Sequence, residues 1–570
     1  MSAPVNILGI WDGHDAGAAL IAGNRLVAAV NEERFTRRKL ETHFPSRSIQ
    51  SCLELARLSA AQIDVVSVST SDLAKTLARW FPSLKESYYQ IRRRSTPPGH
   101  FASIKKEARY WMTECGTNEL LRTLSRHALT RQLRELGMRS AELRLFDHHY
   151  CHATAAAWGC GHPRCAVLTI DGVGDGLAST ISRLVDGQLT RVAASPASDS
   201  LGIFFERVTN LLNMRELEDE GKVMALADYA APVPDDRNPF LPLFEVRNGI
   251  LRASVPGHAM MRHLKKIQWK YPNEQFAQMA QRTVEVVCSQ LALDAIRLTG
   301  QGRLALSGGV MSNVKANRRI RLLPEVDAVY IFPHMGDGGL AVGAALAAVK
   351  GLDVDRCDFS GPGLGLAGEY SDGQIAEALT RADLPLASPP DLIQRVADLL
   401  AAGRIVLWFQ GCMEYGPRAL GHRSVLARPD RQDLRDRLNL TLKQRVLYQP
   451  FCPSMLETEA ARLLADYSGP SNRHMTMAFL TAPQFRQALI GVTSVDGTCR
   501  PQIVPDAAPG RFAELLRAVK LRTGYGVVLN TSYNIHGEPL VRTPDEAIDV
   551  YRRTSADALA IGPYLVLHAD

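Results

Sequence analysis

The stretch Cys165-Ala-Val-Leu-Thr-Ile-Asp-Gly-Val-Gly-Asp-Gly176 decides the fold, because an apolar run leads directly into a glycine-rich turn. A short apolar run bounded by turn residues predicts a buried strand. Ala178-Ser-Thr-Ile-Ser, an Asp186-Gly187 turn and Leu189-Thr-Arg-Val-Ala follow. The whole segment therefore predicts three short strands joined by tight turns.

The same pattern occurs at the N-terminus. Asn6-Ile-Leu-Gly-Ile-Trp-Asp-Gly-His-Asp15 leads into Ala18-Ala-Leu-Ile, a Gly23-Asn24 turn and Leu26-Val-Ala-Ala-Val. Two units of strand, Asp-Gly loop and hairpin predict an internal duplication within one domain. In both units, backbone amides and an aspartate at the first turn can face a phosphate or its metal ion.

A third element is Arg303-Leu-Ala-Leu-Ser-Gly-Gly-Val-Met-Ser-Asn313, which reads as a strand, a double glycine and a helix start. The glycines allow a ligand to approach the backbone, and a helix N-terminus favours negative charge. Asn313 either contacts a ribose or caps its own helix. The duplicated hairpins and this element resemble the actin, Hsp70 and sugar-kinase superfamily, in which nucleotide lies between two related lobes.

A histidine pair precedes the second of these units, in Asp147-His-His-Tyr-Cys-His-Ala153. His148 and His152 stand four residues apart before an alanine-rich run, so both imidazoles are expected on one face of a helix. Asp171 and Asp337 each lie in a glycine-rich turn after an apolar run. The four side chains predict a divalent metal site. A histidine-rich helix start capped by Asp147 is the alternative.

Composition narrows the class of protein. The chain has 570 residues, 46% apolar and 22% charged, which suits two or more globular domains. We expect no signal peptide, and the longest uncharged apolar run, Gly338–Val349, is too short to cross a bilayer. The ten cysteines form no Cys-x-x-Cys pair, which favours reduced thiols. We therefore expect a soluble, cytoplasmic protein.

The net charge of +7 is concentrated in one segment. Residues 72–140 hold fourteen Lys or Arg against six Asp or Glu, with helix-like stretches around 105–110 and 120–136. Such a basic helical insert can bind nucleic acid or attract an anionic ligand. A solvated charged face is the more common reason for such a pattern, and it is the interpretation that we favour.

Residues 351–368 carry a glycine-rich stretch without a periodic apolar face, which predicts a linker. We expect domains at residues 1–354 and 369–570, with the linker at 355–368. The second domain is predicted to begin with helices at 372–382 and 391–402, followed by a strand at 404–411.

The second domain holds a dense group of cations among turn residues, within Met413–Ser424 and Lys443–Arg445. Their charged ends can converge on phosphates. Surface arginines around irregular loops are the alternative. Gly526–Pro539 reads as a buried strand that opens into a polar loop suited to phosphate or amide recognition.

These motifs together resemble the O-carbamoyltransferase family of antibiotic tailoring and nodulation-factor biosynthesis. The matching stretches keep the family's order along nearly the whole chain: His14-Asp15-Ala16, Ala18-Ala19-Leu20, Glu32–Lys39, His148-His149, His152-Ala153, Asp171-Gly172, Gly221-Lys222, Ser307–Val310, Gly416–Gly421 and Asn530-Thr531-Ser532. The resemblance implies an N-terminal domain similar to the tRNA threonylcarbamoyl transferase and a C-terminal α/β domain similar to the threonylcarbamoyl-adenylate synthase.

The resemblance also implies two chemical steps. The C-terminal domain would make carbamoyl-adenylate from carbamoyl phosphate and ATP with Mg²⁺. The N-terminal domain would transfer the carbamoyl group to a hydroxyl of a small-molecule natural product. A labile adenylate favours direct transfer between the sites.

The implied site residues form four groups. The metal ligands, for iron or another divalent metal, are His148, His152, Asp171 and Asp337. The catalytic group is His14 as general base, with Lys39 and Asp12. The adenylate-binding group is Gly172, Lys222, Gly308, Gly309 and Asn313. The carbamoyl phosphate and ATP group is Arg418, Arg423, Lys443, Arg445, Gln449, Arg500, Asn530 and Thr531. His14 can instead bond the loop backbone, and Lys39 and Lys222 can be surface lysines.

Gln449 departs from the family, which usually has an arginine before the Pro-Phe-x-Pro-Ser stretch. Glutamine keeps hydrogen bonds but loses the charge and the bidentate fork. Two other classes remain as alternatives: an RNA-modifying carbamoyl transferase and a non-catalytic nucleotide-binding protein. We expect no nucleic-acid or membrane partner. The sequence identifies neither the acceptor nor the oligomeric state, although a homodimer is compatible with it.

Overall fold

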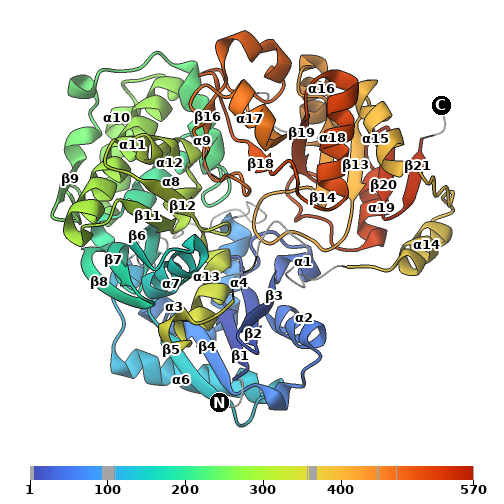
Figure 1. Cartoon of the computed structure of the whole chain (residues 1–570). Helices are drawn as coiled ribbons and strands as arrows, with labels where there is room; N and C mark the ends of the chain where they lie inside the picture. Colours follow the sequence, from blue (N-terminus) through green and yellow to red (C-terminus); the bar gives the residue numbers. More distant parts are fainter. Residues whose placement is uncertain are drawn as a thin grey trace. The chain divides into compact units, whose positions relative to one another are not determined.

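The computed structural model describes residues 5–92, 108, 111–355, 357, 369–443, 446, 448–469 and 471–568 (Figure 1). Its contacts divide the chain into two compact units. The first unit is Met1–Glu32 with Leu40–Cys357, and the second is Glu33–Lys39 with Asp358–Asp570. The predicted linker and the predicted helix around 105–110 lie almost entirely outside the described residues. The short segment Glu33–Lys39 belongs to the second unit, which the sequence did not indicate.

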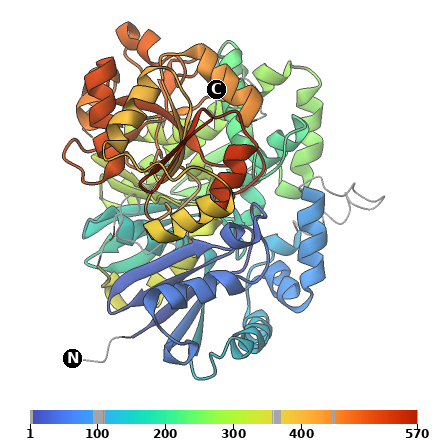
Figure 2. The ribbon, with the colours of Figure 1, turned by 90° about the vertical axis from the view of Figure 1, so that its right-hand side faces the viewer.

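The first sheet of unit 1 has the strand order β3-β2-β1-β4-β5. Its strands are β1 (Ile7–Trp11), β2 (Gly17–Ala22), β3 (Arg25–Asn31), β4 (Val65–Ser69) and β5 (Glu142–Phe146). Strand β1 pairs antiparallel with β2 and parallel with β4. The three antiparallel strands at the N-terminus, drawn in dark blue in Figure 2, confirm the predicted meander.

The second sheet repeats this arrangement, with the order β12-β11-β6-β7-β8. Its strands are β6 (Arg164–Gly174), β7 (Leu177–Val185), β8 (Gln188–Pro196), β11 (Arg303–Ser307) and β12 (Ala328–Ile331). Strand β6 pairs antiparallel with β7 and parallel with β11, as β1 pairs with β2 and β4. Unit 1 is therefore a duplicated α/β domain of the actin, Hsp70 and sugar-kinase type.

Two helices at equivalent positions of the repeats cross closely, α7 (His148–Cys160) after β5 and α13 (Leu340–Ala347) after β12. Glycine is required at the crossing, because a Cβ on Gly343 would lie 2.0 Å from the carbonyl oxygen of Cys151. Thr154 Oγ1 donates to the Gly343 carbonyl at 2.8 Å. The crossing holds α7, whose first two turns carry the histidine pair. Asp147 caps that turn by accepting from the Tyr150 amide at 2.8 Å.

The basic insert between β4 and β5 folds into helices α3 (Leu73–Trp80), α4 (Pro82–Arg92) and α6 (Glu119–Glu135). The interpretation of its charge as a solvated face is wrong for three cations. Lys75, Arg79 and Lys85 are buried. Buried charges are rarely found without partners, and all three face one aspartate described below.

The remaining elements of unit 1 cover the sheets and connect them. They are α2 (Ser46–Ala56), α8 (Leu201–Leu211), α9 (Glu220–Leu226), α10 (Gly257–Gln268), α11 (Asn273–Thr299), α12 (Val314–Arg321) and the hairpin β9 (Phe244–Arg247) and β10 (Ile250–Ala253). Within the part of the chain that the structure describes, no helix combines the length and apolar character that a bilayer crossing requires.

Unit 2 is built on a seven-stranded sheet with the order β18-β15-β19-β14-β13-β20-β21. The strands are β13 (Val406–Phe409), β14 (Arg423–Ala427), β15 (Cys452–Leu456), β18 (Gln502–Val504), β19 (Val527–Ser532), β20 (Ala558–Ile561) and β21 (Tyr564–Leu567). The helices are α14 (Asp372–Arg381), α15 (Leu392–Ala401), α16 (Gln432–Arg437), α17 (Glu457–Leu463), α18 (Arg511–Thr523) and α19 (Pro544–Arg552). The two helices and the strand predicted at the start of this domain are confirmed.

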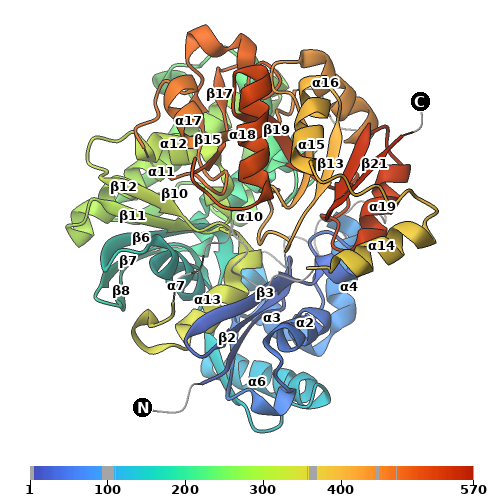
Figure 3. The same ribbon diagram turned by 45° about the vertical axis from the view of Figure 1, so that its right-hand side comes forward.

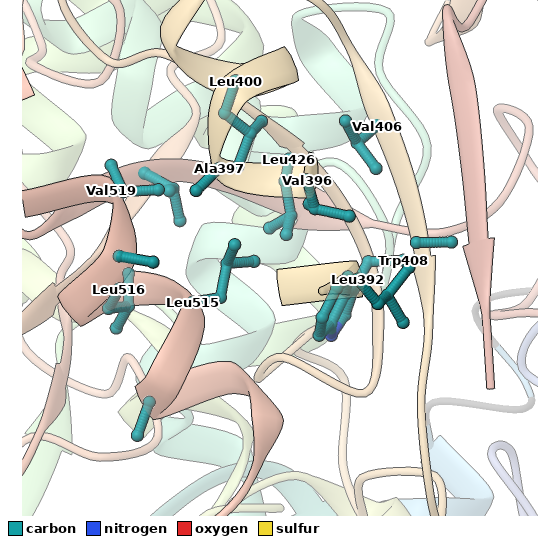
Figure 4. Packing of buried hydrophobic residues seen from close by; sticks show 14 of the residues in the cluster. Leu392, Val396, Ala397, Leu400, Val406, Trp408, Leu426, Leu515, Leu516 and Val519 are labelled. Carbon is teal, nitrogen blue, oxygen red and sulfur yellow. The ribbon is translucent and has the colours of Figure 1, made fainter. Parts of the chain in front are cut away.

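Helices α15 and α18 lie side by side (Figure 3) and bury a common apolar face. Val396 and Leu400 of α15 and Leu515 of α18 pack with Trp408 of β13 in this core (Figure 4). Burial of each such aliphatic side chain stabilises the fold by about 1.5–3 kcal/mol. The indole of Trp408 donates to the carbonyl of Gly421 at 2.9 Å. The core therefore anchors the end of the loop that carries Arg418.

Candidate metal centre and anion site

The predicted metal ligands come together in unit 1. His148 and His152 project from consecutive turns of α7, Asp171 lies near the end of β6, and Asp337 lies in the turn before α13. One ligand atom from each of these four residues lies within 4.8 Å of the others, and all four side chains are buried.

The shortest distances are between the imidazole Nε2 atoms and the two carboxylates. His148 Nε2 lies 3.0 Å from Asp171 Oδ2 and 3.5 Å from Asp337 Oδ1. His152 Nε2 lies 3.8 Å from Asp171 Oδ2 and 3.6 Å from Asp337 Oδ1. Both imidazoles therefore present the same nitrogen to the same two carboxylates.

Neighbouring hydroxyls orient the histidine rings. Ser307 Oγ donates to the Met335 carbonyl at 3.2 Å and lies 3.2 Å from His152 Nδ1. A serine hydroxyl has one proton, so it can only accept from His152 Nδ1–H. That tautomer leaves Nε2 as a free acceptor, as a metal ligand requires. The Nδ1 atom of His148 lies 3.0 Å from Thr70 Oγ1.

Electrostatics within the cluster are strongly coupled. Burial opposes the charged form of His148, but the carboxylates of Asp337 and Asp171 outweigh it and hold its pKa well above the ordinary value. Burial likewise opposes the charged form of Asp171, but the hydrogen bond from His148 and the nearby imidazole of His152 hold its pKa well below the ordinary value. The backbone amide of Gly309 also donates to Asp171 Oδ1 at 2.7 Å. The carboxylates are therefore ionised, as metal ligands must be.

The cluster fits a divalent cation. The buried His152 Nε2 has no hydrogen-bond partner among the described residues, although it faces two carboxylates. A buried acceptor without a partner is costly, and a bound cation would satisfy it. Two imidazoles and two carboxylates form a donor set suited to iron, zinc or manganese.

The loop that carries His14 lies beside this cluster. His14 Nε2 is 3.5 Å from Asp337 Oδ2, and its side chain is 38% exposed. His14 is thus partly accessible. Asp12, in contrast, is buried and paired with Arg79 and Lys75 at 2.8 and 2.9 Å. Burial opposes the ionised form of Asp12, but these cations hold its pKa well below the ordinary value.

The predicted adenylate-binding residues have mixed roles in unit 1. Gly308 has φ +100°, and a Cβ there would lie 2.2 Å from the Ile170 carbonyl oxygen, so the turn requires glycine. Gly172 has open space at its Cβ position. Asn313 caps α12 by accepting from the Ala316 amide at 3.1 Å. Lys222 pairs with Asp219 at 2.7 Å.

Two guanidinium groups of unit 2, those of Arg418 and Arg500, repel each other, and the described residues offer neither of them an acidic partner. Burial and the neighbouring Arg500 lower the pKa of Arg418 to about 9. Arg418 Nε is buried with no hydrogen-bond partner in the described parts of the chain. Arg500 donates through Nε and Nη2 to Cys452 Sγ at 3.2 and 3.0 Å. Like charges held together in this way favour a bound anion.

The loop that carries Arg418 is fixed to the sheet by predicted site residues. Asn530 Nδ2 donates to the Ala419 carbonyl at 3.1 Å, and Gln502 Nε2 donates to the Leu420 carbonyl at 2.8 Å. Asn530 Oδ1 is buried and has no partner among the described residues. Thr531 lies in β19 opposite Val425. These contacts hold the loop backbone.

Two other predicted cations are engaged with backbone groups. Arg423 is buried over the Phe409 ring and donates to the carbonyls of Gln410 and Gly411 at 3.0 Å. Lys443 Nζ donates to the Asn534 side-chain oxygen at 2.7 Å and to its carbonyl at 3.1 Å. These contacts assign both residues a part in holding loops.

Gln449 and Arg445 complete the predicted group. The side-chain oxygen of Gln449 is buried without a hydrogen-bond partner in the described chain. Arg445 lies outside the described residues.

The segment Glu33–Lys39 is bound within unit 2. Arg34 Nη2 donates to the Gly416 carbonyl at 3.1 Å. Arg37 Nη1 donates to the Leu540 carbonyl at 2.7 Å and lies 3.2 Å from Glu546 Oε2. Lys39 therefore belongs to the unit of Arg418, whereas the sequence interpretation grouped it with His14.

Sequence reasoning missed the residues that support the metal cluster and the His14 loop. These are Thr70, Ser307, Lys75, Arg79 and Lys85. Ser307 stood next to the recognised double glycine, so its position was a usable signal. The cations of the insert are 60 or more positions from Asp12 along the chain, and nothing local indicates their pairing.

The chain combines a duplicated α/β unit with a buried cluster of two histidines and two aspartates, and comparison with known proteins identifies its family. The family descriptions "Carbamoyltransferase N-terminus" and "Carbamoyltransferase C-terminus" match residues 6–346 and 397–568. The chain therefore belongs to the carbamoyltransferase family, and it is a carbamoyltransferase.

Relatives agree with this assignment. Nodulation protein NolNO of Sinorhizobium fredii is 29% identical over 97% of this chain and 79% of its own length. Nodulation protein NolO of Bradyrhizobium diazoefficiens is 30% identical over 74% of this chain and 78% of its own. A solved structure of HypF from T. kodakarensis is 14% identical, with a TM-score of 0.35, and the match covers 61% of this chain and 48% of that chain.

Proposed function

We propose that this carbamoyltransferase uses ATP and carbamoyl phosphate to carbamoylate a hydroxyl of a small molecule. The observation that carries the proposal is the pairing of chemistries in one chain. Unit 1 holds a buried cluster of ionised carboxylates and oriented imidazoles, and unit 2 holds two mutually repelling guanidinium groups that have no acidic partner among the residues that the structure describes.

The first step takes place in unit 2. ATP and carbamoyl phosphate bring many negative charges into one place, and this repulsion must be offset. Arg418 and Arg500 supply positive charge that no carboxylate among the described residues neutralises. They bind the phosphates while water splits carbamoyl phosphate into carbamate and inorganic phosphate, and an oxygen of the carbamate then attacks the α-phosphorus of ATP and displaces pyrophosphate. The products are carbamoyl-adenylate, inorganic phosphate and pyrophosphate.

The second step takes place in unit 1. His148, His152, Asp171 and Asp337 would hold a divalent cation, iron by resemblance, whose charge would anchor the adenylate phosphate and polarise the carbamoyl carbonyl. Ser307 and Thr70 keep the imidazoles in the orientation that the cation needs. The double glycine allows the adenylate to approach the backbone beside Asp171.

His14 is the residue that we assign to the acceptor hydroxyl. Its imidazole is partly exposed beside Asp337, so an acceptor can reach it. An imidazole can take the proton of the hydroxyl as its oxygen attacks the carbamoyl carbon and AMP leaves. Asp337, 3.5 Å away, stabilises the imidazolium that results.

The small-molecule acceptor is assigned from the resemblance to the O-carbamoyltransferases of natural-product biosynthesis. An RNA substrate would require exposed cations, with aromatic rings for base stacking. Lys75, Arg79 and Lys85 are buried against Asp12 and its loop and make no such contact, whereas Arg122, Arg131 and Arg134 of the insert are exposed. The experiment that follows therefore separates the two classes of acceptor.

Incubation of the protein with ATP, Mg²⁺ and carbamoyl phosphate tests the proposal. Pyrophosphate and carbamoyl-adenylate should form without RNA. Omission of carbamoyl phosphate should abolish both products. Pyrophosphate release that required RNA, or threonine and bicarbonate in place of carbamoyl phosphate, would support the RNA-modifying alternative.

A further inference from the structure

A guanidinium group of the helical insert contacts the loop that carries His14. Arg79 of α3 is fully buried. Its Nε lies 2.8 Å from Asp12 Oδ2 and its Nη2 lies 3.0 Å from Asp12 Oδ1. This bidentate geometry fixes both the position and the plane of the carboxylate.

Two further cations of the insert act on the same loop. Lys75 Nζ lies 2.9 Å from Asp12 Oδ1 and 3.9 Å from the centroid of the Trp11 ring. Lys85 of α4 donates to the Asp12 carbonyl at 2.7 Å. The insert therefore holds Asp12 by its side chain and its backbone, and holds Trp11 by its ring.

The loop transmits this restraint to His14, because Trp11 to His14 form one tight turn. The indole of Trp11 donates to the His14 carbonyl at 2.8 Å. A Cβ on Gly13 would lie 2.0 Å from the Trp11 ring, so the turn closes directly on the indole. Movement of Asp12 would thus displace the His14 imidazole from Asp337.

Arg79 also reaches the metal cluster from the other side. Its Nη1 donates to the Thr70 carbonyl at 2.9 Å. The hydroxyl of Thr70 lies 3.0 Å from His148 Nδ1. One guanidinium group thus spans the loop of the proposed base and the residue that orients a metal ligand.

The free energy of folding alone does not explain why the cations of the insert are buried around Asp12. Lys75 and Arg79 pair with the buried carboxylate of Asp12, and Lys85 binds the carbonyl of the same residue. Desolvation of ions is expensive, and apolar replacements of buried ion pairs are often neutral or stabilising. A costly buried charge cluster beside a reactive site is typical of a positioning role.

We propose that Arg79 is a positioning residue for carbamoyl transfer, and that helices α3 and α4 of the insert belong to the transfer site. Arg79 touches no reacting atom. It acts through Asp12 on His14 and through Thr70 on His148. The inference rests on the proposed function for its kinetic readout only.

The experiment uses the full chain with Arg79→Met, Arg79→Lys and a matched control, Arg126→Met. Arg126 belongs to the same insert and donates to the Leu143 carbonyl at 2.7 Å, away from the loop. Four quantities are measured: carbamoyl transfer from added carbamoyl-adenylate, pyrophosphate formation, metal content, and amide hydrogen exchange of a peptide that spans residues 11–15.

Arg79→Met should lower kcat for transfer roughly tenfold to a hundredfold, the range seen when residues that orient ligands are removed. KM for carbamoyl-adenylate should change little, pyrophosphate formation should be unchanged, and exchange at residues 11–15 should increase. Arg79→Lys should restore part of the kcat, because lysine keeps the charge but loses the fork. Arg126→Met should behave as the unaltered protein.

A folded Arg79→Met protein with unaltered exchange and unaltered kcat would overturn the proposal. If Arg79→Met does not fold, Lys85→Met decides, because it removes the contact with the Asp12 carbonyl and leaves the Asp12 carboxylate paired with Arg79 and Lys75. Increased exchange at residues 11–15 in Lys85→Met supports the proposal, and unaltered exchange contradicts it. Failure of the proposed function would instead appear as absent pyrophosphate formation in the unaltered protein.

Discussion

The metal cluster of unit 1 and the cation group of unit 2 both bury charged side chains, but the first combines opposite charges and the second brings like charges together. In unit 1, two imidazoles and two carboxylates converge, and every ring has an outer hydrogen-bond partner. In unit 2, the cations divide into two kinds. Arg423 and Lys443 bind carbonyl oxygens, whereas Arg418 and Arg500 face each other. In unit 2, Arg418 and Arg500 are therefore better suited to bind an anionic ligand than Arg423 and Lys443, because no carboxylate among the described residues neutralises their charge.

The largest effect is expected when a ligand of the metal cluster in unit 1 is removed. His152→Ala should abolish carbamoyl transfer, by more than about 100-fold, and remove the bound metal, because it deletes a ligand. Pyrophosphate formation in unit 2 should persist. Metal analysis and the two half-reactions measured separately check this outcome.

The matched control is His149→Gln. His149 is buried beside the ligands, but its ring contacts Thr169 Oγ1 and the Leu177 carbonyl at 2.8 and 3.1 Å. It should retain metal and transfer. Retention of metal and transfer by His152→Ala would show that the metal site lies elsewhere.

The next effect separates the two kinds of cation in unit 2. Arg418→Ala should slow carbamoyl-adenylate formation by about 10²–10³-fold, the effect of losing a preorganised charge contact. It should leave the melting temperature nearly unchanged, because it relieves repulsion with Arg500. Arg423→Ala should lower the melting temperature instead, since it removes a buried side chain bonded to several carbonyls. Equal loss of both half-reactions in Arg418→Ala would argue against separate sites.

A smaller effect concerns the pH dependence of stability in unit 1. Burial lowers the pKa of Lys75 to about 7, in spite of the attraction of Asp12. Between about pH 7 and pH 10 the unfolded chain therefore binds more protons at Lys75 than the folded chain. Its contribution to the free energy of unfolding thus rises with pH through this window, by an amount on the order of a few kcal/mol.

Lys75→Met should remove that rise. Chemical denaturation at several pH values, compared between the two proteins, measures the difference. Parallel pH profiles for the two proteins would mean that Lys75 remains charged throughout.

The smallest effect is expected when a cation is added to the group of unit 2 at position 449. The buried side-chain oxygen of Gln449 has no hydrogen-bond partner among the described residues. Replacement of this side chain by arginine would therefore break no hydrogen bond of that oxygen and would add a group that can bind phosphate. Gln449→Arg should lower KM for ATP or carbamoyl phosphate by a few-fold to about tenfold, with kcat preserved. Steady-state kinetics with each substrate varied in turn check it. Unchanged or raised KM values for both would show that the pocket has adapted to glutamine.

The sequence predicted most of the fold because its signals are local. The two meanders follow from short apolar runs and Asp-Gly turns, and α7 follows from Asp147 and the alanines after His152. The convergence of Asp171 and Asp337 on the histidines could also be expected, because both lie in glycine-rich segments that follow apolar runs of one duplicated domain.

Pairings between distant parts of the chain could not be predicted in this way. Arg79 and Asp12 are 67 positions apart, and a basic helix reads the same whether it faces solvent or a buried carboxylate. Arg423 and Arg418 stand five residues apart in one motif, yet one holds a loop and the other faces Arg500. Their difference lies in the carbonyls around them, which composition does not reveal.

The segment Glu33–Lys39 has a consequence for how the chain is made. Its arginines bond to the carbonyls of Gly416 and Leu540, 382 and 503 positions later. At about 5–20 residues per second, a ribosome needs roughly 25–100 s to supply the last of these partners. Residues on both sides of the segment belong to the first unit, which can fold long before then. During synthesis, residues 33–39 therefore remain without these partners until the C-terminal third of the chain has emerged from the ribosome. A chain truncated before that third would contain the first unit but no binding partner for this segment.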